Sequence, residues 1–228
     1  MVYITGDMHG DAGRWKEKAI RSLKKGDTLI ICGDFGFVWN GTSKEKKFLQ
    51  QLGKQKFTIA FLDGAHENYH YLEQYPVVDW NGGKARRISG ELYHLMRGQV
   101  YELEGGKYFT FGGGESPDEE IREEQDAVFE QAFPSPQEMK MGLENLRKAG
   151  MQVDYILTHE PPCAMRMFLT PGAELTSPLG CYLDQVAKEC SYTRWFFGCC
   201  HIDKPVSGKT VAVFRKVWPV TMETGKRK

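Results

Sequence analysis

Short apolar runs alternate with longer amphipathic stretches along the first third of the chain. The runs at residues 2–5, 28–32 and 57–62 are rich in β-branched and aromatic side chains, which favour buried strands. Between them, apolar side chains recur at helical spacing over residues 12–25 and 43–52. This alternation predicts an α/β protein in which helices cover the strands.

The remaining chain continues this pattern with less regular spacing. Ser43 is the expected N-cap of the helix 43–52, and the acidic stretch 117–131 is expected to form a solvated helical face. The other predicted elements are a helical turn at 68–74, hairpin strands at 100–103 and 108–111, a helix from Ser135 or Gln137 to about Gly150, strands at 153–158 and 195–198, a helix near 183–190, and a last hairpin over 206–220.

The composition is that of a folded globular chain. The 228 residues are 41% hydrophobic and 26% charged, which argues against disorder and predicts a single domain over residues 1–228. Thirty Lys and Arg residues balance thirty Asp and Glu residues. The resulting net charge of zero argues against long nucleic acids and anionic membranes as partners.

Targeting and membrane signals are missing from the sequence. It contains no run of about 18 apolar residues, and its start lacks the basic and apolar regions of a signal peptide. The six cysteines show no Cys-x-x-Cys spacing, so reduced thiols are expected. These features predict a cytoplasmic protein and leave its oligomeric state open.

An Asp or a His follows directly after each of five predicted strands. Because the carboxyl ends of such strands meet at one edge of a sheet or sandwich, these side chains are expected to lie close together, with four of the six histidines among them. The five segments are Gly6-Asp7-Met8-His9-Gly10, Gly33-Asp34, Asp63-Gly64-Ala65-His66-Glu67, Thr158-His159 and Gly198-Cys199-Cys200-His201.

Carboxylate and imidazole side chains in these segments indicate a metal site. Together they suit Mn²⁺, Fe²⁺ or Zn²⁺ better than Ca²⁺, which prefers oxygen ligands alone. Asp7 and His9 can reach one ion from a loop in which Gly6 and Gly10 allow a tight turn. Each segment alone is also typical of an ordinary turn or of a hydrogen-bonded core histidine. Five segments in series favour the metal.

The ordered segments resemble the motifs of the calcineurin-like metallophosphoesterases, which run D-x-H, G-D, G-N-H-[DE], H and G-H-x-H. The match extends over residues 7–201 and is similar to that of short bacterial and phage-type members. The resemblance implies an α/β fold with two mixed β-sheets packed as a sandwich and flanked by helices, in four α-β-β-α layers.

The resemblance also implies a role for each motif residue. Asp7, His9 and His201 would hold one divalent transition metal ion, and His159 would hold a second. Asp34 would bridge both ions, and His66 would be the general acid. His66 and Asp34 are therefore the expected catalytic residues.

Two motif positions depart from the family pattern, and both belong to the second metal. Ala65 stands where the family has Asn, and Cys199 stands where it has the first His of G-H-x-H. Cys199 is either a thiolate ligand of Zn²⁺ or Fe²⁺ or a small buried thiol beside Cys200. The sequence leaves open whether the second ion binds.

Two functions of different classes are compatible with these residues. The first is metal-dependent hydrolysis of a small phosphorylated substrate, in which a metal-bound hydroxide attacks phosphorus and His66 protonates the leaving group. The alternative is a degenerate metallophosphoesterase that binds a metal or a phosphorylated ligand without turnover. The retained carboxylates Asp7 and Asp34 favour the hydrolase, since they are costly to bury without a metal. Whether the substrate is a monoester or a diester stays open.

Overall fold

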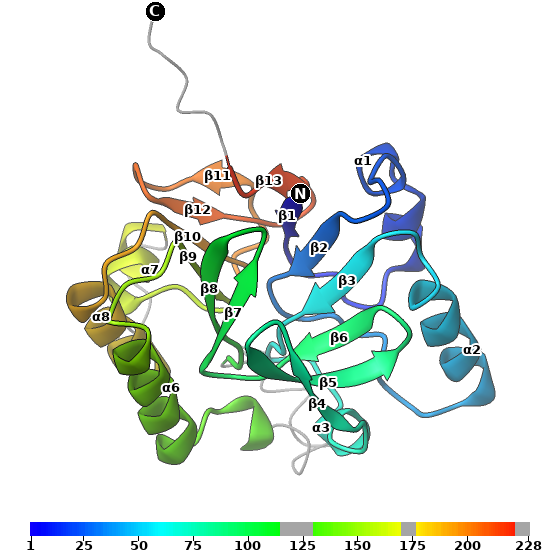
Figure 1. Cartoon of the computed structure of the whole chain (residues 1–228), viewed down its shortest axis with the longest axis horizontal. Helices are drawn as coiled ribbons and strands as arrows, with labels where there is room; N and C mark the ends of the chain where they lie inside the picture. Colours follow the sequence, from blue (N-terminus) through cyan, green and yellow to red (C-terminus); the bar gives the residue numbers. More distant parts are fainter. Residues whose placement is uncertain (115–129, 170–176, 222–228) are drawn as a thin grey trace, which may run out of the picture.

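Two β-sheets lie face to face in the computed structural model, which describes residues 1–114, 130–169 and 177–221 (Figure 1). The first sheet has the spatial order β13 (Trp218–Pro219), β1 (Val2–Thr5), β2 (Thr28–Ile31), β3 (Thr58–Phe61), β6 (Leu92–Leu95), β5 (Gly83–Ser89) and β4 (Val77–Trp80). The second sheet has the order β11 (Lys204–Pro205), β12 (Thr210–Ala212), β10 (Arg194–Phe197), β9 (Tyr155–Thr158), β8 (Gly106–Phe111) and β7 (Gln99–Leu103).

Both sheets are mixed, and their central strands run parallel. In the first sheet β1, β2 and β3 pair in parallel, while β13 is antiparallel to β1 at one edge and β4 is antiparallel to β5 at the other. In the second sheet β8, β9, β10 and β12 pair in parallel. The carboxyl ends of the parallel strands therefore lie together at one edge of each sheet.

Helices cover the outer face of the first sheet. Along β2, Ile30 lies in the core between the sheets, whereas Leu29 and Ile31 lie in the core under the helices, as the two-residue period of a strand requires. The outer core also includes Leu49 of α2 (Ser43–Leu52) and Leu72 of α3 (Tyr69–Leu72). This face thus forms one helical layer on one sheet.

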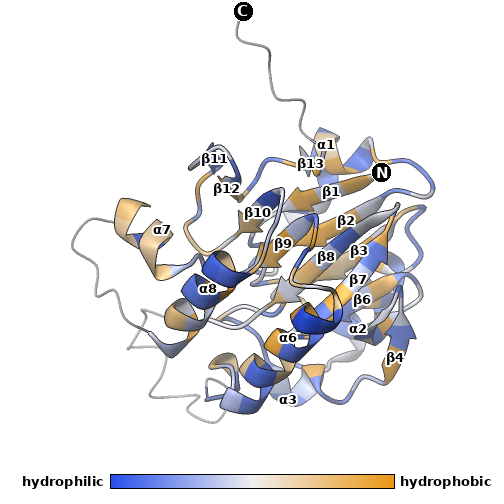
Figure 2. Ribbon diagram, turned by 60° about the vertical axis from the view of Figure 1, so that its left-hand side comes forward, coloured by the Kyte–Doolittle hydropathy of each residue, from blue (hydrophilic) through white to orange (hydrophobic). Residues whose placement is uncertain are grey.

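A second helical layer covers the other sheet. Leu146 of α6 (Pro136–Lys148) and Leu183 of α8 (Pro178–Glu189) share a core with Phe109 and Ile156. Figure 2 shows blue, hydrophilic residues along the sides of α6 and α8 that face away from the sheets. The four layers confirm the predicted α/β sandwich. None of the helices in the described part of the chain has the length and apolar character needed to cross a membrane.

The helix starts follow the sequence signals closely. Thr42, rather than Ser43, caps α2, because the Thr42 hydroxyl accepts the backbone N–H of Glu45. Ser135 caps α6 in a capping box with Glu138, as one of the two predicted starts required. Short helices also include α7 (Cys163–Leu169) and the 3₁₀ turn η2 (Glu130–Ala132).

The predicted helix 12–25 is shorter and interrupted. The structure has a 3₁₀ turn η1 (Ala12–Lys16) and a single α-helical turn α1 (Lys18–Arg21), separated by Glu17 in an extended conformation. The buried Arg14 side chain donates to the Asp7 carbonyl oxygen (2.9 Å) and to Thr5 Oγ1 (3.0 Å). Arg14 thus holds the Asp7 loop, and residues 12–25 do not form the regular helical face that the spacing predicts.

Other differences lie toward the ends of the two sheets. The predicted hairpin 206–220 is wrong in its second part, because β11 and β12 pair with each other while β13 crosses to β1 in the first sheet. Strands β4, β5 and β6 were not predicted. The helical face predicted at 117–131 lies, up to residue 129, outside the described residues.

Candidate metal centre

The carboxyl ends of parallel strands from both sheets carry the predicted site residues. In the first sheet Asp7 follows β1, Asp34 follows β2 and His66 follows β3; in the second, His159 follows β9, and Cys199 and His201 follow β10. The packing of the two sheets brings their ligand loops within contact distance, so the site is shared between both sheets.

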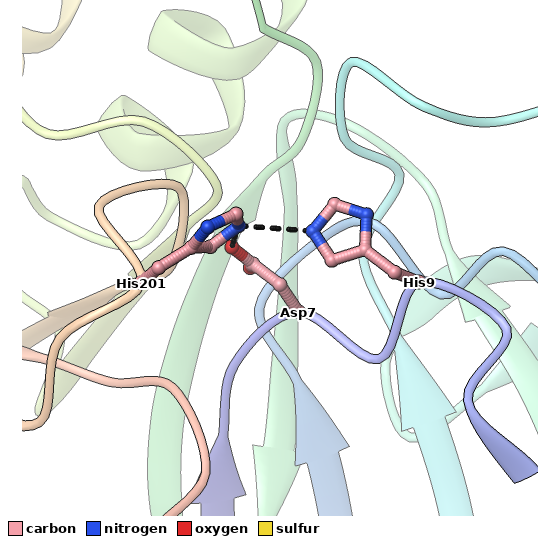
Figure 3. Close-up of side chains that lie close together, drawn as sticks. All are labelled: Asp7, His9 and His201. Atoms are coloured by element: carbon pink, nitrogen blue, oxygen red, sulfur yellow. Dashed lines mark hydrogen bonds and ion pairs between the residues drawn. The ribbon is translucent and has the colours of Figure 1, made fainter.

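The first part of this cluster consists of the buried Asp7 and the two exposed histidines His9 and His201 (Figure 3). His201 Nε2 lies 3.1 Å from Asp7 Oδ2 and 2.9 Å from His9 Nε2. Two imidazole nitrogens at this distance repel each other unless one is protonated or a cation lies near both. Asp7 Oδ2 is buried and, within the described residues, accepts no well-aligned hydrogen bond. Two nitrogens around an unsatisfied buried oxygen fit a divalent transition metal.

Asp34 lies at the centre of the cluster with its carboxylate buried. Its Oδ1 accepts the His66 backbone N–H (2.8 Å) and is 3.7 Å from His159 Nε2. Its Oδ2 is 3.1 Å from His66 Nδ1 and 3.6 Å from His9 Nε2. Burial alone would raise the pKa of Asp34, but the charge of His159 and the hydrogen bonds from His66 hold that pKa well below its usual range.

His159 is buried between the two aspartates. Its Nδ1 donates to the Cys32 carbonyl oxygen (3.1 Å), which leaves Nε2 directed toward Asp34. Burial alone would lower the pKa of His159, but the charges of Asp34 and Asp7 raise it to about 9. The two carboxylates thus stabilise a positive charge beside them, and either a proton on His159 or a bound metal ion can supply that charge.

Three overlapping groups of possible ligand atoms result, each with its atoms within 4.8 Å of one another among the described residues. They are Asp7 with His9 and His201, His9 with Asp34 and His66, and Asp7 with Asp34 and His159. His66, which the sequence assigns to proton transfer, therefore also lies close enough to Asp34 for both side chains to hold the same ion.

Glycines allow the ligand loops to approach one another. Gly33 has a φ of +96°, and a Cβ at this position would overlap the His159 imidazole. A Cβ at Gly64 would overlap the Asp34 carboxylate. Asp34 itself has a φ of 45°, a region that residues with a Cβ seldom occupy. The crowding explains the glycines beside the predicted ligands.

Comparison with known families shows to which family this arrangement belongs. The profile of the calcineurin-like phosphoesterase family matches residues 1–187, which include the D-x-H, G-D and G-x-H-E segments and His159. The chain belongs to this family. The family usually binds divalent metals, in agreement with the ligand groups of this calcineurin-like phosphoesterase.

Individual proteins give little further information on this phosphoesterase. No curated protein matches its sequence significantly. Among solved structures, a protein of unknown function from Aquifex aeolicus is 13% identical, with a match that covers 84% of this chain and 87% of that chain at a TM-score of 0.37. A likeness at that TM-score supports no conclusion about function.

One predicted ligand of the phosphoesterase, Cys199, lies outside the three groups. Its Sγ is 3.7 Å from Cys200 Sγ and 3.9 Å from Arg166 Nη2, while its backbone N–H donates to Asp7 Oδ1 (3.3 Å). The contact with Cys200 and burial raise the pKa of the Cys199 thiol well above its ordinary value. The other departure, Ala65, is buried and offers no ligand atom. Ligation by Cys199 stays a prediction.

Glu67 supports the phosphoesterase site, although it is not among the residues predicted to form the site. Its carboxylate accepts the backbone N–H groups of Phe35 (2.6 Å) and Gly36 (3.3 Å), which fixes the loop after Asp34. Burial raises the pKa of Glu67 well above its ordinary value. The available signal was its place directly after His66, where the family motif has an acidic residue.

Asp63 anchors the other end of the His66 loop. Its Oδ1 accepts from His94 Nε2 (2.9 Å), and its Oδ2 accepts from Arg97 Nε (2.7 Å). The Tyr69 hydroxyl donates to the Gly64 carbonyl oxygen (2.6 Å) and lies 3.1 Å from Asp63. Burial alone would raise the pKa of Asp63, but Arg97 and His94 hold it well below its usual range. This network fixes the backbone that presents His66.

Proposed function

We propose that this phosphoesterase hydrolyses small phosphate esters with divalent transition metal ions and with His66 as the general acid. Asp7, His9 and His201 would hold one ion, His159 would hold the other, and Asp34 would bridge them. When bound, ions such as Mn²⁺, Fe²⁺ or Zn²⁺ polarise phosphoryl oxygens and lower the pKa of a water molecule toward neutrality.

The placement of Asp34 is the observation that carries this proposal. One of its carboxylate oxygens faces His9 (3.6 Å) and the other faces His159 (3.7 Å). Each oxygen is thus directed toward a different histidine, an arrangement in which one carboxylate can serve two ions. The His9 side comes from the D-x-H loop of the first sheet, whereas His159 belongs to the second sheet.

The position of His66 supports its assignment to proton transfer. Its side chain is 25% exposed, so a substrate can reach it, whereas Asp34 and His159 are nearly inaccessible. The contact of Nδ1 with Asp34 orients the ring, and the backbone N–H bond to the same carboxylate fixes its position. A partly exposed, oriented imidazole beside two ligand groups suits general acid catalysis.

Metal removal tests the proposed function. Purified protein is stripped with a chelator, and turnover of p-nitrophenyl phosphate and bis(p-nitrophenyl) phosphate is measured before and after the addition of Mn²⁺, Fe²⁺ or Zn²⁺. We expect turnover to disappear on chelation and to return with at least one ion, since Asp7 and Asp34 alone repel a phosphate. Undiminished turnover by protein shown to be metal-free would contradict the proposal.

Restoring the family residues at positions 65 and 199 tests whether these positions limit binding of the second ion. Ala65→Asn with Cys199→His should raise bound metal toward two ions per chain and increase turnover with Mn²⁺, because an amide oxygen and an imidazole nitrogen are added as ligands. We expect the second ion to bind about tenfold more tightly or better.

Elemental analysis and Mn²⁺ titration measure this effect. Both single variants are needed, because neighbouring ligands of one ion do not act additively. Cys181→His, at an exposed cysteine, controls for an added surface imidazole. A double variant that gains neither metal nor rate would favour the alternative function, a binding protein without turnover.

A further inference from the structure

A groove lined by aromatic side chains lies beside His9 and His66. It has a volume of about 810 Å³ and runs between the loop after β2 and helix α2. Phe37, Trp39 and Phe48 line it, and we call it the aromatic groove. Sites for small organic molecules typically measure about 300–1,000 Å³, so the aromatic groove can hold much more than a phosphate group.

Two of these aromatic rings are in direct contact. The ring centroids of Phe37 and Phe48 are 5.2 Å apart, and Phe37 also contacts Phe35 behind it at 5.0 Å. Trp39 and Phe48 are half-buried, so part of each ring remains accessible from the groove. Such rings offer flat apolar surface against which a planar group can stack.

The wall of the aromatic groove is held rigidly to the segment that carries His66. Asn68 Nδ2 donates to the Trp39 carbonyl oxygen (2.6 Å), and the Glu67 carboxylate accepts the Gly36 N–H (3.3 Å). Farther along the same loop, Glu45 accepts the Asn40 backbone N–H (2.7 Å). The groove is therefore formed before any ligand binds, in a fixed position relative to His66.

Polar groups at the rim match a nitrogen heterocycle better than a hydrocarbon ring. The exposed side chains of Lys44, Lys47 and Gln51 line the groove, and they provide several hydrogen-bond donors and one amide acceptor. A few polar groups around an apolar wall are typical of sites that orient a small polar molecule.

We propose that the aromatic groove binds the leaving group of the substrate and that this group is an alcohol of nucleoside size that carries a heteroaromatic base. The inference rests on the proposed function: a general acid must lie next to the oxygen that departs, and His66 lines the groove. The phosphoryl group then lies at the metal centre, while the heterocycle stacks on Trp39 and Phe48.

A pair of substrates with the same alcohol oxygen tests this assignment. Adenosine 5′-monophosphate and ribose 5-phosphate differ in the base but share a primary alcohol as the leaving group. We expect kcat/KM to favour the adenosine ester by at least about tenfold, since stacking of one base on aromatic side chains is worth this much. Trp39→Ala should remove the preference, because it lowers kcat/KM for the adenosine ester more than for ribose 5-phosphate.

Phe168→Ala provides the matched control, because Phe168 is an exposed aromatic residue on α7 that does not line the groove. It should keep the full preference. Equal kcat/KM values for the two esters in the unmodified protein, or an unchanged preference in Trp39→Ala, would overturn the assignment.

Binding of adenosine alone separates this inference from the proposed function. Calorimetry with adenosine and with ribose does not require turnover, and it applies equally if the natural substrate is a diester. We expect adenosine to bind at least about tenfold more tightly than ribose and Trp39→Ala to abolish the difference. Adenosine binding without hydrolysis of any ester would contradict only the proposed function. Hydrolysis without adenosine binding would contradict only the groove assignment.

Discussion

Asp34→Asn is expected to lower turnover of phosphate esters to below about one thousandth of the unmodified value and to reduce the bound metal. The substitution keeps the size of the side chain but removes the negative charge that faces His9, His66 and His159. An amide also offers one oxygen instead of two, so it cannot present an oxygen both toward His9 and toward His159. Activity assays and elemental analysis on the same preparation measure both effects.

Asp79→Asn is a matched control for this change, since Asp79 is an exposed aspartate on β4. It should leave metal content and turnover unchanged. If Asp34→Asn instead retains full metal content together with normal turnover, Asp34 does not bridge two ions. Loss of turnover with full metal content would place the role of Asp34 in orienting His66.

His66→Ala is expected to reduce turnover of an alkyl phosphate such as glycerol phosphate by about 10²–10⁴-fold while metal remains bound. The alkoxide leaves poorly without a proton, and removal of His66 takes away the partly exposed imidazole next to Asp34. p-Nitrophenyl phosphate should lose much less activity, because its acidic phenol departs without protonation. The ratio of the two losses is the measurement.

His70→Ala controls for the loss of an imidazole nearby, because His70 lies on α3 and is exposed. It should affect neither substrate. Equal losses on both substrates in His66→Ala would contradict a role in protonating the leaving group. Such equal losses together with lost metal would instead indicate that His66 is a ligand, as its distance to Asp34 permits.

The strands that carry the site could be predicted because they are buried on both faces. Residues of β2 and β3 point alternately into the core between the sheets and into the core under the helices, so each strand is a continuous apolar run. Such a run ends visibly where small or polar residues begin, as at Gly33-Asp34 or Thr158-His159. The fold class and the position of the site follow from those ends.

The last two strands at the β4 end of the first sheet gave no comparable signal. β5 contains Lys84, Arg86 and Arg87, and its side chains alternate between buried and exposed or half-exposed positions. β4, at the sheet edge, is exposed along much of its length. Polar residues on such strands blunt an open edge, and they also interrupt the apolar runs by which strands are recognised.

The supporting residues could not be predicted for another reason. Asp63 is separated by 31 residues from His94 and by 34 from Arg97. No local spacing connects such partners, and Asp and Arg are usually found on the surface. Only the fold brings them together under the His66 loop.

The division of the ligands between the two sheets links metal binding to folding. Asp7, His9 and Asp34 belong to the first sheet, whereas His159 and His201 belong to the second. An ion held by both sets would cross-link the layers of the sandwich, and the unfolded chain has no equivalent site. At a free metal concentration of 100 times the dissociation constant, such linkage adds about 2.7 kcal/mol to the free energy of unfolding. The melting temperature of the protein would then report which ions the site accepts, without any substrate.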